Sequence, residues 1–142
     1  MNIIEFTSND QESFELLKSS SWPAADAEHY GTNPPQFFEE TFTLLAKEDE
    51  RAMGYIKVTC DSGVAKIDEL MIDSDRKGQG IGTELLQAAE EKTKSLDCHK
   101  IWLETGSDWK AKDFYLKHGY QVRTVLPNHT GNREFVLMDK MI

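Results

Sequence analysis

Hydrophobic and polar residues alternate along the middle of the chain in a way that predicts three consecutive strands. The alternating runs cover residues 43–47, 51–59 and 64–73, and alternation over such short runs is typical of strands with one buried face. The segments between them, Glu48-Asp49-Glu50 and Asp61-Ser62-Gly63, are rich in turn-forming residues. Because short turns of this kind join antiparallel neighbours, the pattern predicts a meander.

The pattern changes to a helical period at Ile81. Apolar side chains then recur at positions that share one side of a helix, and polar side chains occupy the other side. The apolar positions are Ile81, Leu85, Leu86, Ala88 and Ala89, and the polar positions are Glu84, Gln87, Glu91 and Lys94. One side of this helix is therefore expected to be buried.

Strands and a helix alternate in the rest of the chain. The predicted elements are a strand around Ile101 and Leu103, a helix over residues 109–118 that ends at Gly119, and two strands over residues 120–126 and 133–139. This order predicts an α/β (α+β) fold, in which a mixed, largely antiparallel central sheet is flanked by helices.

The first 42 residues are less regular. Residues 2–6 are strand-like, and Asn9 or Asp10 is placed to cap a helix. Residues 19–36 are rich in turn-forming residues, which predicts a long loop, and Pro34-Pro35 suits the start of a short helix. Phe14, Leu16 and Leu17 are the expected apolar residues of the first helix, and Phe37, Phe38 and Phe42 are those of the second.

Length and charge narrow the class of protein. The 142 residues fit one domain, 1–142, and the 16 basic against 25 acidic side chains give a net charge of −9. An acidic chain without a basic cluster is a poor partner for nucleic acid and a better one for a cation. We expect no signal peptide and no membrane span, hence a soluble cytoplasmic protein in which Cys60 and Cys98 stay reduced.

A glycine-rich segment between a predicted strand and the helix at Ile81 is the most specific chemical feature. The segment is Lys77-Gly78-Gln79-Gly80-Ile81-Gly82-Thr83. Glycine lets the backbone approach a ligand closely, and the free N–H groups of a first helical turn bind anions such as a pyrophosphate. The segment lacks the Gly-Lys-Ser/Thr ending of a P-loop and has Thr83 where a dinucleotide fingerprint needs glycine.

The segment resembles the signature of the GNAT superfamily of acyl-CoA-dependent N-acetyltransferases, Arg/Gln-x-x-Gly-x-Gly/Ala, with Lys77 at the first position. A second block, Asp108-x-x-Ala111-x-x-Phe114-Tyr115-x-x-x-Gly119-Tyr120, is similar to the family's Asn-x-x-Ala-x-x-hydrophobic-Tyr-x-x-x-Gly-Phe. The resemblance covers residues 51–142 well and the first fifty residues only in general layout. It implies an acetyltransferase with acetyl-CoA as co-substrate and no metal.

The resemblance also implies where acetyl-CoA binds. Its pyrophosphate would lie on the segment Lys77, Gly78, Gln79, Gly80, Ile81, Gly82 and Thr83, mainly on the backbone from Gln79 onward. Its pantetheine arm would pair like an extra strand with Met71 and Ile72, and Asp108 would contact the pantetheine linker. Such pairing needs unpaired N–H and C=O groups, which family members provide by splaying this strand from the next, often at a bulge.

Transfer of an acetyl group to an amine needs a neutral amine, a polarised carbonyl and a proton for the leaving thiolate. The resemblance makes Tyr115 the candidate proton donor; the alternative is a tyrosine packed with Ala111 and Phe114. Glu69 is the first candidate base. We expect it to share a strand face with Ile67 and Met71, so that its carboxylate lies on a largely apolar surface.

Glu104, at the end of the next strand, is the competing base, and water can relay the proton in either case. Each glutamate can also be a solvated or ion-paired strand residue. His118 is expected to interact with a helix dipole instead of acting in catalysis. His29, His99 and His129 show no metal-ligand spacing, and Cys98 is expected to be a small buried residue.

The acceptor is expected to be a primary amine of a small molecule or peptide. Its pocket would be built from residues 127–129 and from N-terminal aromatic residues, of which Phe37 and Phe38 are better explained as core. The full aromatic set is Trp22, His29, Tyr30, Phe37 and Phe38. A non-catalytic acyl-CoA-binding regulatory module of the same fold is the alternative function. The oligomeric state is open, and a homodimer is one option.

Overall fold

A six-stranded sheet forms the centre of residues 37–142 in the computed structural model, which describes all 142 residues. The strands are β1 (Glu39–Glu48), β2 (Arg51–Asp61), β3 (Val64–Ile72), β4 (Lys100–Gly106), β5 (Gln121–Leu126) and β6 (Phe135–Met141). Their spatial order is β1-β2-β3-β4-β6-β5. All neighbours are antiparallel except β3 and β4, which are parallel. The predicted fold class and the predicted meander β1–β3 are confirmed.

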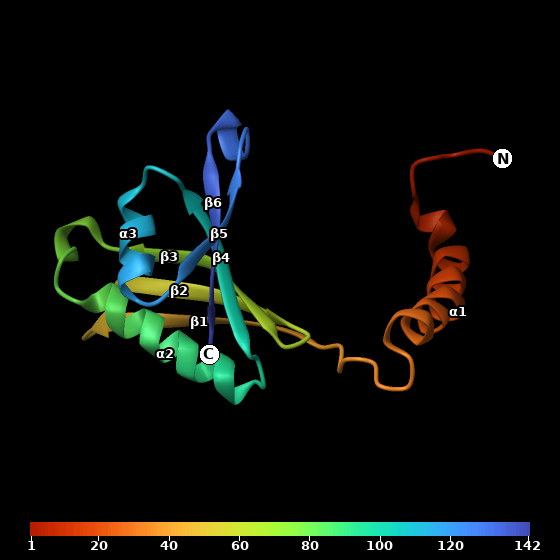
Figure 1. Cartoon of the computed structure of the whole chain (residues 1–142), viewed down its shortest axis with the longest axis horizontal. Helices are drawn as coiled ribbons and strands as arrows, with labels where there is room; N and C mark the ends of the chain where they lie inside the picture. Colours follow the sequence, from red (N-terminus) through yellow and green to blue (C-terminus); the bar gives the residue numbers. More distant parts are fainter. The chain divides into compact units, whose positions relative to one another are not determined.

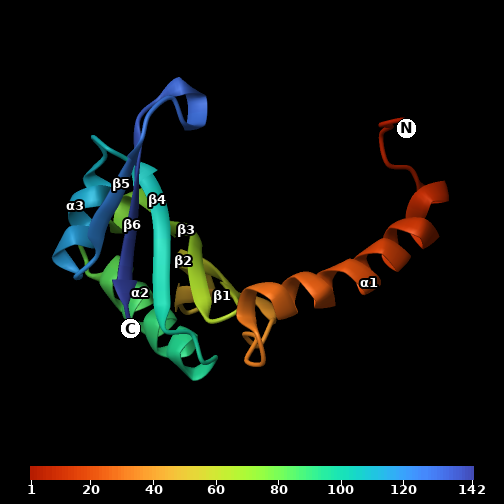
Figure 2. The same cartoon turned by 45° about the vertical axis from the view of Figure 1, so that its right-hand side comes forward.

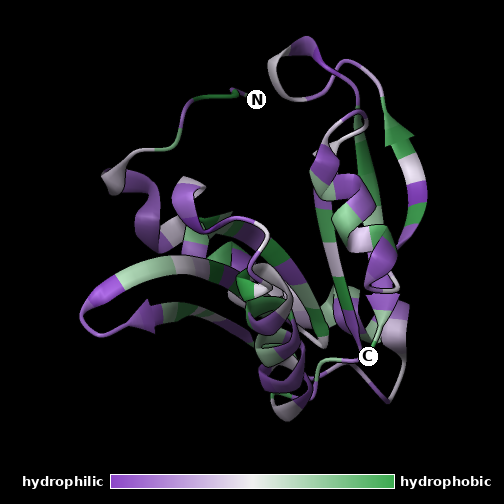
Figure 3. Cartoon of the chain, turned by 90° about the vertical axis from the view of Figure 1, so that its left-hand side faces the viewer, coloured by the Kyte–Doolittle hydropathy of each residue, from purple (hydrophilic) through white to green (hydrophobic).

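Two helices pack against this sheet. Helix α2 (Ile81–Ser95) contacts β1, β2 and β3, and α3 (Lys110–Lys117) contacts β4 (Figure 1). Strand β6 lies beside β4, and β5 lies on the other side of β6 (Figure 2). The buried side of α2 is the predicted one, since Ile81, Leu85, Leu86 and Ala89 all enter the core, although Ala88 is exposed. Along the strands, hydrophobic and hydrophilic residues alternate (Figure 3), as period-2 burial requires.

Strands β3 and β4 pair only at their beginnings. The pairing joins Val64 to Lys100, Ala65 to Ile101 and Lys66 to Trp102, and no later pair continues it. Beyond these pairs the edge of β3 that faces β4 has no strand partner. The structure thus has the splayed strands that the resemblance required.

A bulge in β3 lies just beyond the last of these pairs. On β2, Lys57 is opposite Glu69 while its neighbour Val58 is opposite Ile67, so Asp68 is the additional residue on β3. A one-residue insertion reverses which side chains face the core. Before the bulge Ile67 is buried, whereas after it Leu70 packs on the core and Glu69 is exposed.

The chain divides into two units, residues 1–36 and 37–142. The first unit contains a short 3₁₀ turn, η1 (Ser8–Asp10), and the long helix α1 (Gln11–Tyr30). Helix α1 begins after Asp10 as predicted, but the Asp10 side chain does not cap it and instead accepts the backbone N–H of Thr7 at 2.9 Å. Residues 2–6, predicted as a strand, belong to no helix or strand.

Residues 19–30 were predicted as a loop but are helical. The hydroxyls of Ser19 and Ser20 donate to the carbonyls of Leu16 and Leu17, which keeps these serines compatible with a helix. Pro23 lies inside α1, where it removes one helical hydrogen bond, and the alanine-rich stretch that follows favours helix. The turn-forming residues therefore did not end the helix.

The helix predicted after Pro34-Pro35 is absent, because residues 39–48 form β1. Phe42, expected on a helix face, lies in the sheet core together with Leu44 and Ala46. These three residues occur at every second position, which is the period of a strand and not of a helix. Three aromatic residues close together had suggested the wrong period.

Candidate functional site

Two glycines shape the loop between β3 and α2. Gly78 and Gly80 have φ angles of +79° and +84°, and a Cβ atom at either position would meet nothing within 4 Å. The loop therefore requires glycine for its backbone conformation and not for lack of space. Gly80 is the N-cap residue of α2, and no side chain caps this end. The N–H groups of Ile81, Gly82 and Thr83 are consequently available to an anion.

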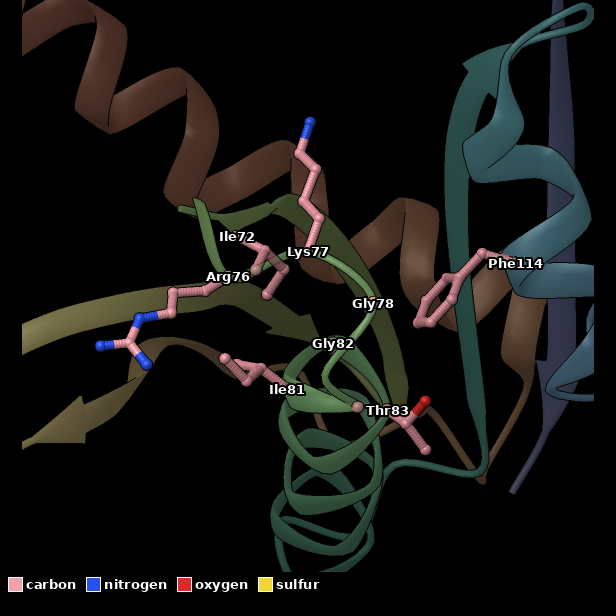
Figure 4. A pocket seen from close by; sticks show the side chains of 9 residues that line it. Ile72, Arg76, Lys77, Gly78, Ile81, Gly82, Thr83 and Phe114 are labelled. Carbon is pink, nitrogen blue, oxygen red and sulfur yellow. The ribbon is translucent and has the colours of Figure 1, made fainter. Parts of the chain in front are cut away.

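A cavity of about 260 Å³ lies over this loop (Figure 4). Its lining residues are Ile72, Arg76, Lys77, Gly78, Gly80, Ile81, Gly82, Thr83 and Phe114. Phe114, from α3, faces the glycine loop across the cavity. Arg76 donates to the Glu48 carboxylate at 2.6 Å, whereas Lys77 is exposed and forms no ion pair. The donor set of backbone N–H groups and a free ammonium suits a diphosphate.

A second cavity, of about 440 Å³, continues along the unpaired edge of β3. It is lined on one side by Leu70, Met71 and Ile72 and on the other by residues of α3, including Ala111 and Tyr115. Met71 and Ile72 therefore line a cavity on a strand edge without a partner, and their pairing with a pantetheine arm stays a prediction. Such an edge can accept an extended ligand as an additional strand.

A third cavity, of about 520 Å³, extends from β3 to the end of β4. Lys77 lines all three cavities, and Tyr115 lines the second and third. The third cavity is also lined by the predicted bases Glu69 and Glu104 and by Trp109, which no sequence motif indicated. The site is thus a series of adjoining cavities that begins at the N-terminus of α2 and reaches two carboxylates.

Tyr115 is buried, with 6% of its surface exposed, and contacts the rings of Phe114 and Tyr120. Burial raises the pKa of Tyr115 to about 12. A phenol favours its neutral form when it is desolvated, so this side chain keeps its proton and offers an O–H donor at neutral pH. The expected packing of Tyr115 against Phe114 is confirmed, and Tyr115 also lines the second and third cavities. Its role as proton donor stays a prediction.

The expected surroundings of Glu69 were wrong in one respect. Because of the bulge at Asp68, Glu69 and Ile67 do not share a face of β3. Ile67 lies in the core, whereas Glu69 lies on the same face as Met71, which is exposed. The Glu69 carboxylate accepts a hydrogen bond of 2.5 Å from the Tyr55 hydroxyl on β2. This bond to the carboxylate raises the pKa of Tyr55. Glu69 is therefore held by a phenol on a neighbouring strand instead of resting on an apolar face.

Glu104 is paired with a histidine that lies 25 residues later in the sequence. The His129 Nε2 atom is 3.1 Å from a carboxylate oxygen of Glu104, and the imidazole contacts the ring of Phe135 at a centroid distance of 5.4 Å. His129 belongs to the loop between β5 and β6, which is predicted to form part of the acceptor pocket. No local spacing signals this pair, because the long β5–β6 connection brings the two residues together.

His118 occupies the C-terminal end of α3 and contacts two elements. Its Nδ1 atom is 2.7 Å from the backbone oxygen of Phe114, and its Nε2 atom is 3.1 Å from the hydroxyl of Thr83 on α2. The expectation of a helix C-terminal residue is confirmed. Its contact with the glycine-loop helix was not predicted.

Several predicted residues lie outside the three cavities. Gln79 is exposed in the loop without lining a cavity, and Asp108 is exposed in the turn before α3. Trp22, His29 and Tyr30 belong to the first unit. The proposed contacts of these residues with ligands stay predictions. Cys60 and Cys98 are buried and not joined by a disulfide.

Comparison with known proteins identifies the family. The sequence model of the acetyltransferase (GNAT) family matches residues 7–120. The uncharacterized protein YdhI of Bacillus subtilis is 42% identical over 110 residues, which cover 72% of this chain and 68% of YdhI. The chain belongs to the GNAT acetyltransferase family.

Solved structures agree on the fold. A crystal structure of an acetyltransferase from Bacillus cereus superposes with a TM-score of 0.78 at 24% identity, covering 100% of this chain and 98% of that one. The PaiA N-acetyltransferase of Thermoplasma acidophilum, solved in complex with coenzyme A, gives a TM-score of 0.63 at 20% identity and covers 96% of this chain and 80% of that one. At these identities the likeness concerns the fold alone.

None of the helices is both long enough and apolar enough to cross a membrane.

Proposed function

We propose that this protein transfers an acetyl group from acetyl-CoA directly to a primary amine of a small molecule or peptide. The observation that supports this most is the series of cavities that joins the glycine loop, the unpaired edge of β3 and the buried phenol of Tyr115. Coenzyme A is bound in the PaiA structure of the same fold. The family match begins in the first unit and ends in the second, so we treat residues 1–142 as one N-acetyltransferase domain.

The residues present suit acetyl-CoA. The glycine loop, the first turn of α2 and Lys77 would hold the diphosphate, and the free edge of β3 at Met71 and Ile72 would bind the amide groups of the pantetheine arm. When bound, acetyl-CoA supplies an activated acetyl group as a thioester. No metal enters this proposal.

The proton transfers are assigned to side chains along the third cavity. Glu69 would accept a proton from the acceptor amine, directly or through water, while its bond with Tyr55 fixes the carboxylate. Glu104, oriented by His129, is the alternative base. Tyr115 would donate its hydroxyl proton to the leaving thiolate, since its raised pKa keeps that proton in place until it is needed.

A panel of amines tests the proposal. The purified protein is mixed with acetyl-CoA and with polyamines, aminoglycosides, amino acids or peptides, and the thiol released is measured over time. The expected result is release that depends on at least one amine and a matching mass increase of one acetyl group on that amine. Binding of CoA without release for any amine would support the alternative, a regulatory acyl-CoA-binding module. Location in the cytoplasm and the oligomeric state stay predictions.

A further inference from the structure

The imidazole of His118 links the end of α3 to the beginning of α2. Its Nδ1 atom lies 2.7 Å from the backbone oxygen of Phe114, and its Nε2 atom lies 3.1 Å from Oγ1 of Thr83. Thr83 lines the cavity over the glycine loop and is in the first turn of α2. His118 itself does not line any of the three cavities. It contacts two residues that line the first cavity, Thr83 and Phe114, and the Thr83 hydroxyl is the one whose hydrogen bonding depends on the charge of the imidazole.

The chemistry of these partners fixes the protons. A backbone carbonyl oxygen only accepts, so Nδ1 of His118 must carry a hydrogen and donate it to Phe114. In the neutral ring Nε2 then has no hydrogen and must accept the hydroxyl hydrogen of Thr83. When the ring is protonated, Nε2 becomes a donor and Thr83 Oγ1 accepts. The charge of His118 thus decides in which direction the Thr83 hydroxyl hydrogen points.

This direction matters for an anion in the cavity. Diphosphate oxygens only accept hydrogen bonds, and a threonine hydroxyl has a single hydrogen to give. While neutral His118 holds that hydrogen, Thr83 presents only lone pairs to the anion. Protonated His118 releases it, so that the hydroxyl can donate to the diphosphate beside the N–H groups of α2.

We propose that His118 is a positioning residue for the diphosphate of acetyl-CoA, and that binding of this diphosphate is coupled to protonation of His118 through the Thr83 hydroxyl. The inference rests on the proposed function, because it assigns the diphosphate to the cavity over the glycine loop. Histidine is the side chain that changes charge between pH 5 and 8. The affinity for the cofactor is then higher at pH 6 than at pH 8.

Other charged groups near this contact are engaged or exposed. None of the charged side chains on α2, on α3 or in the glycine loop forms a hydrogen bond or an ion pair with the imidazole. Glu90 is instead paired with Lys140, whose side chain lies against Gly119. The groups are Asp113 and Lys117 on α3, Glu84 and Glu90 on α2, Lys140 on β6, and Arg76 and Lys77 in the glycine loop. Protonation of His118 therefore affects binding of the diphosphate through the Thr83 hydroxyl and not through an ion pair with a neighbouring carboxylate.

The test measures binding of 3′-dephospho-CoA by isothermal titration calorimetry. This probe keeps the diphosphate but lacks the 3′-phosphate, whose own proton titrates near pH 6. Titrations at pH 6, 7 and 8, each in two buffers of different ionisation enthalpy, give both the affinity and the number of protons exchanged. For the unmodified protein we expect uptake of a fraction of a proton on binding and an affinity about three- to tenfold lower at pH 8 than at pH 6.

Variants separate the hydroxyl relay from a simple charge effect. Thr83→Val removes the hydroxyl but leaves the imidazole, and we expect most of the pH dependence to disappear; Thr83→Ser keeps the hydroxyl and should keep the dependence. His118→Gln supplies an amide that does not titrate, and affinity should become constant across pH. His99→Gln, at an exposed histidine away from the site, is the control and should behave as the unmodified protein.

Two results would overturn the inference and leave the proposed function standing: binding with no proton uptake and constant affinity, or full pH dependence retained in Thr83→Val. Failure to bind either CoA or dephospho-CoA at any pH would instead overturn the proposed function itself. The circular dichroism spectrum of each variant checks that it is folded, and Thr83→Ala, which also lacks the hydroxyl, provides the answer if Thr83→Val does not fold.

Discussion

At the scale of single residues, burial gives Tyr115 its chemical character. The side chain lies at the junction of the second and third cavities, and desolvation raises its pKa to about 12. Tyr120 has a similar environment, since it is also buried, and its hydroxyl donates to Glu90. Tyr120 does not line the cavities, however. The two phenols therefore form a natural pair for separating chemistry from packing.

Replacing Tyr115 by phenylalanine removes only the hydroxyl. We expect kcat to fall about 100-fold, because the leaving thiolate loses its proton donor, while the Kd for CoA changes by less than about twofold. Steady-state kinetics and calorimetry measure the two quantities. Tyr120→Phe is the matched control and should affect stability more than kcat. An unchanged kcat in Tyr115→Phe would remove this residue from the mechanism.

The raised pKa of Tyr115 also has a consequence for the pH profile. With a pKa of about 12, the phenol stays protonated throughout the range from pH 6 to pH 10. We expect kcat/KM to rise with pH as the acceptor amine loses its proton and then to stay level, with no decline caused by Tyr115 below pH 10. Rates measured with one amine over this range check this. A decline near pH 9 that Tyr115→Phe abolishes would contradict it.

At the scale of elements, the beginning of α2 combines an unusual backbone with free N–H groups. We expect Gly80→Val to weaken CoA binding at least tenfold, because a side chain at a φ of +84° costs about 1–2 kcal/mol and displaces the first turn. Calorimetry with CoA measures the effect. Gly31→Val is the matched control. Gly31 also has a positive φ angle, +61°, and a Cβ atom there would meet nothing within 4 Å, but Gly31 follows α1 and does not belong to the glycine loop. Equal losses in both variants would mean that the loop has no special role.

Strands β4, β5 and β6 share one buried carboxylate. Asp139 on β6 is bonded to Lys100 on β4 at 3.0 Å and to Arg123 on β5. Desolvation opposes ionisation of Asp139, but the bonds to Arg123 and Lys100 outweigh it and lower its pKa. These strands therefore depend on a charged side chain as well as on backbone pairing.

We expect Asp139→Asn to lower the free energy of unfolding by about 2 kcal/mol at pH 7, since it breaks a charged, buried hydrogen-bond pair. The pKa of Asp139 is lower in the folded state, so its contribution is present above its ordinary pKa of 3.8 and is lost as pH falls below that value. Urea unfolding at pH 7 and pH 3 measures the difference, with exposed Asp97→Asn as control. An equal loss at both pH values would contradict the assignment.

The elements show why some predictions were correct and others were not. Helix α2 and strands β2 and β3 follow from the period of their own residues. Residues 19–30 and Phe42 were misassigned, because serine, proline and aromatic residues are compatible with more than one local structure. The face of Glu69 was misplaced because a bulge is set by pairing with β2 and not by the alternation within β3.

At the scale of the whole molecule, net charge and ligand charge are opposed. The protein has a net charge of −9, yet the proposed co-substrate is a polyanion. Recognition of that ligand must rest on local donors, namely the N–H groups at the beginning of α2 and the unpaired Lys77. The overall negative field instead favours a cationic acceptor.

This opposition predicts a salt effect. Raising potassium chloride from 50 to 300 mM should increase the KM of a cationic amine several-fold, because screening weakens its attraction to an acidic protein. The KM of acetyl-CoA should change less or fall. Initial rates at each salt concentration measure both constants, and the same ionic strength from a different salt controls for specific ion effects. An amine KM that does not rise would count against attraction by the net charge.

The sequence by itself determined the order of helices and strands from residue 43 onward, the glycine loop, the aromatic block of α3 and, through these motifs, the family. These features depend on residues that are close along the chain, so a local pattern is sufficient. Only the tertiary structure decided the bulge at Asp68, the divergence of β3 from β4 and the pairs Glu104–His129 and Thr83–His118. The partners in these two pairs are 25 and 35 residues apart, and packing of separate elements, not local periodicity, brings them within hydrogen-bonding distance.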